Sequence, residues 1–302
     1  MIRARTVFDG EADKRAYVAE CEAGYEAALD EAVRRVLAVP DCRIVTLSGP
    51  TCSGKTTTAR KLISEFSDAG RRVHVVSIDD FYLDRSLLIE RANEAGTPID
   101  FDSPTTIDME TFGEAVAAIL SGKPARIPHF DFPSGRRTAM ETVEPDGHDV
   151  YIFEGIQAIY PEVTACFAGH SYVSVAAFAE RGILLGDLTI DRTKLRLLRR
   201  LVRDYNFRGA SPVFTLGLWE SVRANEERHI LPYMDRVDIR IDSTLAYEIS
   251  ALKPYLAPLL STLPAEHSFR PCADAILGTL SRIDEISKTY IPKTSVYREF
   301  LG

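Results

Sequence analysis

The chain has 302 residues, of which 45% are hydrophobic and 26% charged, so its size and composition suit a globular protein with one large or two small α/β domains. A formal net charge of −8 argues against general binding to nucleic acid or to an anionic membrane. No apolar run approaches the roughly 18 residues of a membrane-spanning helix. Its five cysteines are scattered without C-x-x-C spacing, which indicates reduced thiols in the cytoplasm and no zinc site.

A long helix is predicted over residues 11–38, ending before Pro40. Its apolar side chains recur with a rough 3.6-residue period, as seen for Tyr17, Cys21 and Tyr25. Such a face packs against a folded core more often than it binds a partner protein. We therefore expect this helix to cover the outside of the main domain.

A glycine-rich loop follows the first predicted strand, residues 43–48, and precedes a predicted helix over about 54–69. The loop has the pattern G-x-x-x-x-G-K-T and comprises Gly49, Pro50, Thr51, Cys52, Ser53, Gly54, Lys55 and Thr56, with Thr57 next in the helix. In this pattern, called the P-loop below, backbone N–H groups and the helix N-terminus surround phosphate groups. Lys55 is expected to reach the β- and γ-phosphates of ATP, and the Thr56 hydroxyl to bind Mg²⁺.

Two further predicted strands end in carboxylates. Residues 73–78 lead into Asp79 and Asp80, and residues 149–155 contain Glu154 near their end. Ligands of open parallel sheets bind at the carboxyl ends of the strands. We expect one of the paired aspartates to act in chemistry and the other to act structurally, with helix N-capping as the structural alternative. Glu154 is expected to hold Mg²⁺ or its water.

Between these strands, residues 83–107 show no clear periodicity and are predicted to form an irregular substrate loop. A helix is predicted over 108–120, with Asp108 as its N-cap. The segment 127–137 combines aromatic side chains with Arg137 and is predicted to form a pocket wall.

A fourth strand is predicted over 172–178, and a helix over 191–206 carries an arginine stripe. Four arginines recur at steps of four, three and four residues and so share one helix face: Arg192, Arg196, Arg199 and Arg203. A solvated face is the common reading of such a stripe. Here the local positive charge runs against the net charge of the chain, and Arg208 follows before a turn, so we favour contact with phosphate.

The remaining predicted elements are a helix over 219–231, a strand over 237–241, helices over 245–260 and 273–286, and a docked tail over 290–302. Several segments together resemble the uridine kinase and phosphoribulokinase family of P-loop kinases. The resemblance runs from about 44 to 245 and rests on the P-loop, Ser77 to Tyr82, Phe101 to Pro104, Ile127 to Phe132, Phe153 to Ile156, and Arg196 to Asp204 closed by Arg208-Gly209. Residues 280–302 are similar to the C-terminal end of a bacterial uridine-kinase-like branch.

The resemblance implies a three-layer α/β fold of the P-loop NTPase type, with a five-stranded parallel sheet and a helical lid at about 190–210. It makes residues 41–245 the kinase domain, between helical extensions at 1–40 and 246–302. Family members are often oligomers, but the sequence identifies no interface.

The resemblance also implies transfer of the ATP γ-phosphate to a sugar hydroxyl, with Mg²⁺ as cofactor and no nucleic-acid or membrane partner. Asp79 matches the catalytic base, Lys55, Arg199 and Arg203 match groups that stabilise the transferred phosphate, and Thr56 and Glu154 match the metal site. The expected substrate-binding residues are Asp79, Tyr82, Asp102, Phe130, Phe132, Arg137 and Arg208.

One departure concerns the pyrimidine site. Phe130 stands where uridine kinases have a tyrosine, and Gly135 where they have a histidine, so two hydrogen bonds to the base are missing. Uridine or cytidine remains the first expectation for the acceptor. The alternatives are a non-nucleoside alcohol, such as a sugar phosphate, pantothenate or glycerate, and a regulatory protein that binds ATP without an acceptor.

Overall fold

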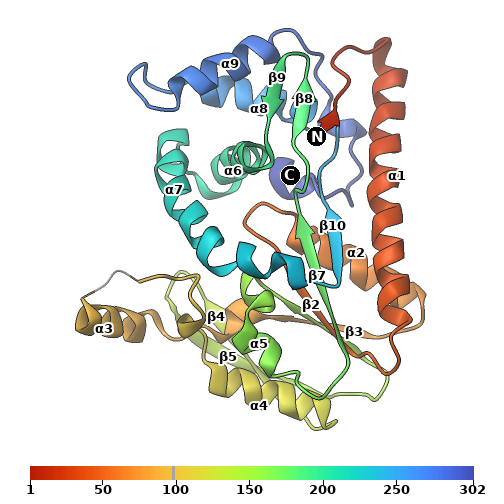
Figure 1. Cartoon of the computed structure of the whole chain (residues 1–302), viewed down its shortest axis with the longest axis vertical. Coiled ribbons are helices and arrows are strands. Elements are labelled where there is room, and N and C mark those ends of the chain that lie inside the picture. The colour runs from red at the N-terminus through yellow and green to blue at the C-terminus, as the bar shows by residue number, and fades with distance from the viewer. Residues whose placement is uncertain (97–98) are drawn as a thin grey trace.

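The computed structural model describes residues 1–96 and 99–302. Within these residues the main sheet has five parallel strands in the order β10-β7-β2-β6-β3 (Figure 1). The strands are β2 (Ile44–Ser48), β3 (Val73–Ser77), β6 (Val150–Glu154), β7 (Tyr172–Phe178) and β10 (Ile239–Asp242). The predicted five-stranded sheet is therefore confirmed.

The sheet is the middle of three layers. Alternate residues of one strand face opposite sides, so Val45 and Leu47 pack with α1 (Gly10–Leu37) and α2 (Lys55–Asp68), while Ile44 joins the core beneath α4 (Met109–Leu120). Phe66 of α2 and Phe112 of α4 are both fully buried. Burial of each contributes about 1.5–3 kcal/mol. Helices on both faces explain why the strands read as continuous apolar runs.

Further helices are α3 (Arg85–Ala95), α5 (Pro161–Ala165), α6 (Arg192–Arg208), α7 (Pro212–His229), α8 (Glu248–Ser261), α9 (Arg270–Leu280) and α10 (Arg298–Leu301). Short 3-10 turns are η1 (Ile78–Phe81), η2 (Pro104–Thr106), η3 (Ile156–Ile159), η4 (Leu231–Arg236) and η5 (Lys288–Tyr290). Two smaller sheets comprise β1 (Ile2–Arg3), β8 (Ile183–Leu185) and β9 (Leu188–Ile190), and the hairpin of β4 (Ala125–Asp131) and β5 (Arg136–Val143). In the described part of the chain, no helix is long and apolar enough to cross a membrane.

Several local predictions differ from the structure, among them the helix predicted over 273–286, which is α9 and ends at Leu280. The segment 83–107 was expected to be irregular but contains α3, which buries only Leu88 and so has no apolar period to detect. Thr97 and Pro98 of that segment lie outside the described residues. The hairpin at 125–143 was missed because most of β5 is exposed. Helix α7 starts at Pro212 rather than Trp219, with Ser211 as its N-cap.

The predicted N-terminal extension packs on α2 and β10, and the predicted C-terminal extension packs on α6. Val18 and Leu29 of α1 lie in the same core cluster as Leu256 of α8 and Phe300 of the tail. The tail is therefore docked, as predicted, and the chain terminus lies beside α6 in Figure 1. The division into 1–40, 41–245 and 246–302 stays a prediction, since side chains from all three ranges share this cluster.

Candidate functional site

The P-loop joins the central strand β2 to α2 with an unusual backbone. Gly54 caps α2 with a φ of 89°, and Gly49 has a φ of 153°. A Cβ on Gly49 would lie 2.1 Å from the carbonyl oxygen of Ala177, so no side chain fits there. The first backbone N–H groups of α2 have no partner within their helix, and together with the helix dipole they favour an anion at this point.

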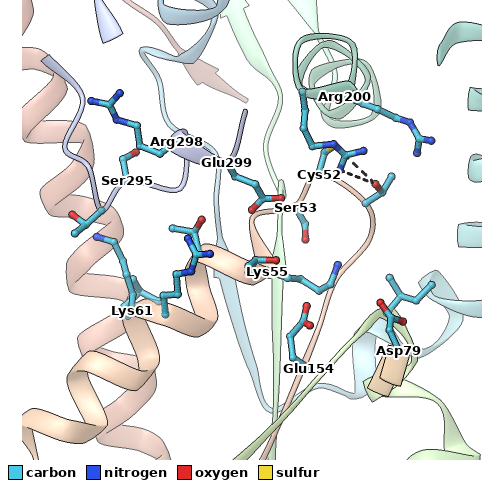
Figure 2. Close-up of a pocket in the computed structure, with 18 of the residues that line it drawn as sticks. Cys52, Ser53, Lys55, Lys61, Asp79, Glu154, Arg200, Ser295, Arg298 and Glu299 are labelled. Atoms are coloured by element: carbon cyan, nitrogen blue, oxygen red, sulfur yellow. Dashed lines mark hydrogen bonds between the residues drawn. The ribbon is translucent and has the colours of Figure 1, made fainter. Parts of the chain in front are cut away.

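A cavity of about 1260 Å³, called the central cavity below, opens over the P-loop (Figure 2). Six predicted ATP-binding residues line it: Thr51, Cys52, Ser53, Lys55, Thr56 and Thr57. Of the remaining predicted residues, Asp79, Tyr82, Asp102, Phe132, Glu154, Arg203 and Arg208 also line it. The strand register places these groups together, because Ser77 of β3 and Leu47 of β2 both pair with Glu154 of β6.

Asp79 lies just after β3, and burial raises the pKa of its carboxyl group, while the Gln157 hydrogen bond and the Lys55 charge lower it. The Gln157 Nε2 atom donates to Asp79 Oδ1 at 3.0 Å and to the Tyr82 hydroxyl at 2.7 Å. Gln157 was not predicted as a site residue. The sequence feature that could have identified it is its position three residues after Glu154, at the same end of the sheet.

The neighbouring Asp80 has a different role. Its Oδ1 atom accepts a hydrogen bond from the backbone N–H of Phe130 at 2.9 Å, and His129 Nδ1 lies 3.3 Å away. Asp80 therefore ties η1 to β4 and does not line the central cavity. This agrees with the expectation that one aspartate is structural, although its partner is a strand and not a helix N-terminus.

Asp102 also lines the cavity and is held by α7. Asn225 Nδ2 of α7 donates to Asp102 Oδ2 at 3.0 Å, and the Tyr160 hydroxyl donates to the Asp102 carbonyl oxygen at 2.7 Å. Burial raises the pKa of Asp102, and the Asn225 hydrogen bond opposes that rise. Asn225 was also missed, because nothing in the sequence links a residue of α7 to one 123 positions earlier.

Three arginines of α6 line the cavity: Arg200, Arg203 and Arg208. Their guanidinium groups share one carboxylate, with nitrogen–oxygen distances to Asp204 of 3.2, 2.7 and 3.6 Å respectively. One carboxylate cannot balance three guanidinium groups, so this wall carries an excess of positive charge. That charge suits phosphate groups above the P-loop. Arg200 was not singled out from the sequence.

The prediction that Arg199 acts in catalysis is wrong in this structure. Its side chain is fully buried and does not line the cavity. It pairs with Glu248 at 2.8 Å and donates to the Cys52 carbonyl oxygen at 3.2 Å. Arg196 is likewise buried and donates to the Thr51 carbonyl oxygen at 3.0 Å. This part of the arginine stripe faces the interior and holds the P-loop from behind.

The prediction that Phe130 and Arg137 bind substrate is also wrong in this structure, because neither side chain lines the central cavity. The Phe130 ring is buried against Tyr82, with 5.7 Å between ring centroids. Arg137 donates to the Tyr82 carbonyl oxygen at 3.1 Å and to Asp108 at 2.7 Å. Both side chains support Tyr82 from outside the pocket, whereas Phe132 remains in its wall.

The sequence matches the model of the phosphoribulokinase / uridine kinase family over residues 44–250. Uridine-cytidine kinase B of Dictyostelium discoideum is 27% identical over 228 residues, which cover 75% of this chain and 85% of that protein. Uridine kinase of Deinococcus deserti is 31% identical over 170 residues, which cover 56% and 72%. The crystal structure of a proposed fructose transport system kinase from Silicibacter sp. TM1040 has a TM-score of 0.50 at 24% identity, covers 70% of this chain and 98% of that one, and shows the same fold.

The family match spans well over half of the chain and contains the P-loop, both strand-end carboxylates and the arginine helix α6. These are also the elements that the fold brings together around the central cavity. This chain therefore belongs to the phosphoribulokinase / uridine kinase family.

Proposed function

We propose that this protein is an ATP-dependent kinase that transfers the γ-phosphate to a hydroxyl group of a small molecule, with a nucleoside such as uridine or cytidine as acceptor. One observation carries the proposal: a single cavity joins the P-loop to the carboxylate of Asp79. The relatives named uridine kinase and uridine-cytidine kinase support a nucleoside as acceptor.

The phosphates would lie on the P-loop backbone, with Lys55 at the β- and γ-phosphates and the arginines Arg200, Arg203 and Arg208 above them. Phosphoryl transfer requires little covalent chemistry of the protein, so positioning and charge stabilisation would supply most of the rate enhancement. Helix α6 is anchored by buried ion pairs with Glu226 and Glu248, so it would shield the bound nucleotide from water as a fixed wall and so limit hydrolysis of ATP.

A magnesium ion fits the oxygen groups of the cavity. Thr56 lies at the start of α2 and Glu154 at the end of β6, and both line the cavity. Within the described residues, no three His, Cys, Asp or Glu side chains cluster closely enough to hold a metal alone. Mg²⁺ commonly takes one or two protein oxygens and completes its shell with phosphates and water. Bound there, it would neutralise charge on the phosphates.

Asp79 would act as general base. Its Oδ1 atom is held by Gln157, and no hydrogen bond to Oδ2 is formed by any described residue. The acceptor hydroxyl would pass its proton to this carboxylate as its oxygen bonds to the γ-phosphorus. The bond from the γ-phosphorus to the bridging oxygen would break at the same time and leave ADP. Asp102, held by Asn225, would accept hydrogen bonds from the acceptor's other hydroxyl groups.

The residues at the two positions where uridine kinases read the pyrimidine, Phe130 and Gly135, favour a second class of acceptor. Phe130 is buried and its ring has no polar atom, and Gly135 has no side chain, so neither residue offers a side-chain hydrogen bond to a base. This supports a non-nucleoside alcohol, such as a sugar phosphate, pantothenate or glycerate, as the alternative acceptor. A regulatory protein that binds ATP without any acceptor is a further alternative.

The test of function is ADP release from ATP and Mg²⁺ across an acceptor panel of nucleosides, ribose and ribulose phosphates, pantothenate and glycerate. We expect uridine or cytidine to stimulate release strongly. Stimulation only by a non-nucleoside would select the alternative acceptor. Tight ATP binding with no stimulation by any member of the panel would contradict the kinase proposal and favour the regulatory role.

The pH dependence of kcat/KM tests the role of Asp79. Its carboxylate is the active form, and burial raises its pKa, so the acid limb of the profile should lie above the ordinary aspartate value of 3.8. Gln157 donates to the carboxylate and so favours the charged form. The variant Gln157→Leu should therefore move the acid limb to higher pH. An unmoved limb in this variant would contradict the role of Gln157 in setting the pKa.

A further inference from the structure

The C-terminal segment, defined here as residues 293–299, forms part of the cavity wall although it lies beyond the family match of 44–250. Lys293, Thr294, Ser295, Arg298 and Glu299 all line the cavity. Figure 2 shows Glu299 pointing toward the P-loop, with Lys55 between it and Asp79 in that view. The segment thus stands on the P-loop side of the cavity, apart from the proposed acceptor side.

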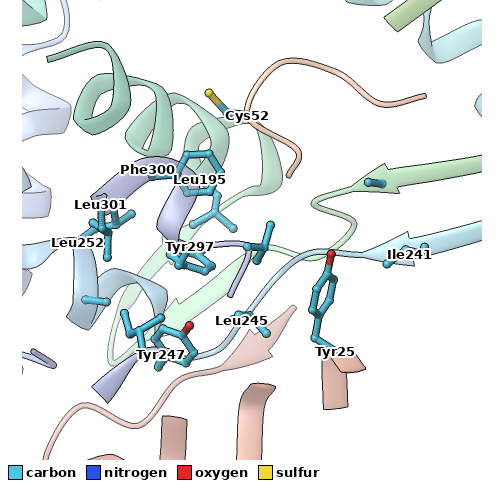
Figure 3. Close-up of a cluster of buried hydrophobic side chains, with 14 of the residues drawn as sticks. Tyr25, Cys52, Leu195, Ile241, Leu245, Tyr247, Leu252, Tyr297, Phe300 and Leu301 are labelled. Carbon is cyan, nitrogen blue, oxygen red and sulfur yellow. The ribbon is translucent and has the colours of Figure 1, made fainter. Parts of the chain in front are cut away.

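The segment is held firmly in place. Tyr297, Phe300 and Leu301 are buried in the core cluster shown in Figure 3. The Tyr297 hydroxyl accepts a hydrogen bond from Arg199 Nε at 3.1 Å. Arg298 donates to the carbonyl oxygens of Lys288 and Ile291 at 3.0 and 2.7 Å. These contacts make the segment a fixed wall and not a loose tail.

The segment also touches the P-loop directly. A Cβ placed on Gly54 would lie 2.2 Å from Val296 Cγ2, so Val296 packs where any side chain at position 54 would project. Gly54 is the N-cap of α2. The wall therefore begins beside the backbone that would hold the phosphates.

Two polar atoms at this wall have no hydrogen-bond partner among the described residues. They are Glu299 Oε2 and Ser53 Oγ, and both atoms are buried. Buried polar atoms are nearly always satisfied in folded proteins, and both side chains line the central cavity, so a molecule bound there can supply the missing partners. The Ser53 hydroxyl can donate to a phosphate oxygen.

The carboxylate of Glu299 needs a hydrogen-bond donor as its partner, which a phosphate oxygen cannot be. An ionised carboxylate only accepts hydrogen bonds, and the phosphate oxygens of ATP at neutral pH have almost no protons to donate. Donor groups of a nucleotide lie in its nucleoside part, as the ribose hydroxyls and the amino group of the base. The charge of Glu299 would repel the phosphates but would strengthen a hydrogen bond from one of these donors.

We infer that Glu299 is a nucleotide-recognition residue whose carboxylate accepts a hydrogen bond from an O–H or N–H group of the nucleoside part of ATP. This inference rests on the nucleotide binding in the proposed function and assigns the C-terminal segment to the site. The hydroxyl and amino groups share this chemistry, and the experiment separates them.

The test is calorimetric binding without any acceptor, using ATP, 2′-deoxy-ATP, inosine triphosphate and inorganic tripolyphosphate. Glu299→Ala should weaken ATP binding about 10-fold. It should leave tripolyphosphate binding unchanged or tighter, because tripolyphosphate has no nucleoside part and is repelled by the carboxylate. Glu299→Gln keeps the side-chain shape and should weaken ATP binding less. Glu266→Ala, at an exposed position outside the cavity, changes the net charge equally and should alter neither ligand.

The nucleotide analogues identify the donor. If 2′-deoxy-ATP binds the wild type and Glu299→Ala equally well, the partner of Glu299 is the ribose 2′-hydroxyl. If inosine triphosphate binds the two proteins equally well, the partner is the amino group of the base. Equal effects of Glu299→Ala on ATP and tripolyphosphate, or no effect on ATP, would overturn the inference while leaving nucleotide binding intact. Absence of ATP binding in the wild type would instead overturn the proposed function and this inference with it. Thermal melting of each variant confirms that it is folded.

Discussion

Replacing Asp79 by asparagine should reduce kcat about 10²–10⁴-fold and leave the dissociation constant for ATP nearly unchanged. The amide has the same shape as the carboxylate and can keep the hydrogen bond from Gln157 Nε2 through its oxygen. It cannot take up the proton of the acceptor hydroxyl. The P-loop and Lys55 are untouched, so the nucleotide half of the cavity should bind as before. Steady-state ADP release and calorimetric ATP binding measure the two quantities.

The adjacent Asp80 offers a matched control. Asp80→Asn keeps an oxygen that can accept the Phe130 N–H hydrogen bond, and its side chain does not line the cavity. We expect this variant to retain most of its turnover. Wild-type turnover in Asp79→Asn would contradict the assignment of Asp79 as the base. Equal losses in both variants would indicate that the change acts through the local fold around η1.

Replacing Arg199 by methionine should lower the free energy of unfolding by about 3–5 kcal/mol. Arg199 and Glu248 are both fully buried, and their side chains form two hydrogen bonds at 2.8 and 3.0 Å. Removal of the guanidinium leaves a buried carboxylate without its counter-charge and frees the carbonyl oxygen of Cys52 and the hydroxyl of Tyr297. Urea unfolding of the purified protein measures the change.

The partner and a neighbouring arginine provide the controls. The double variant Arg199→Met with Glu248→Leu removes both charges and should recover a large part of the lost stability. Arg192→Met, on the same arginine stripe but exposed at the start of α6, should change stability by no more than about 1 kcal/mol. A small effect of Arg199→Met, similar to that of Arg192→Met, would show that the buried pair does not stabilise the fold.

The arginine stripe shows why residue spacing predicts a shared face but not its surroundings. Steps of three and four place Arg196, Arg199 and Arg203 on one side of α6, as expected. Whether that side meets solvent, phosphate or buried carboxylates depends on Glu226 and Glu248, which come 30 and 49 residues after their arginines. The sequence contains no periodic signal that links such distant positions.

On the acceptor side of the cavity, too, the sequence identified individual residues but not their distant partners. Asp79 and Asp102 could be named in advance, because carboxylates after a buried strand or in an aromatic loop are poorly explained by packing. Their partners Gln157 and Asn225 lie 78 and 123 residues later and became visible only when the sheet and α7 were in place. Phe130 and Arg137 were misplaced because alternation along a strand puts neighbouring residues on opposite sides, and the hairpin itself was not predicted.

The sequence by itself determined the features that local physics controls. Buried apolar runs specified the five strands, two glycines specified the P-loop backbone, and carboxylates after β3 and within β6 marked the edge of the sheet where ligands bind. Only the tertiary structure decided which charged groups face the cavity and which are paired inside. It also brought Glu299, 245 residues after Gly54, to the P-loop, since a packing contact such as that of Val296 on Gly54 depends on the fold and not on neighbours in the chain.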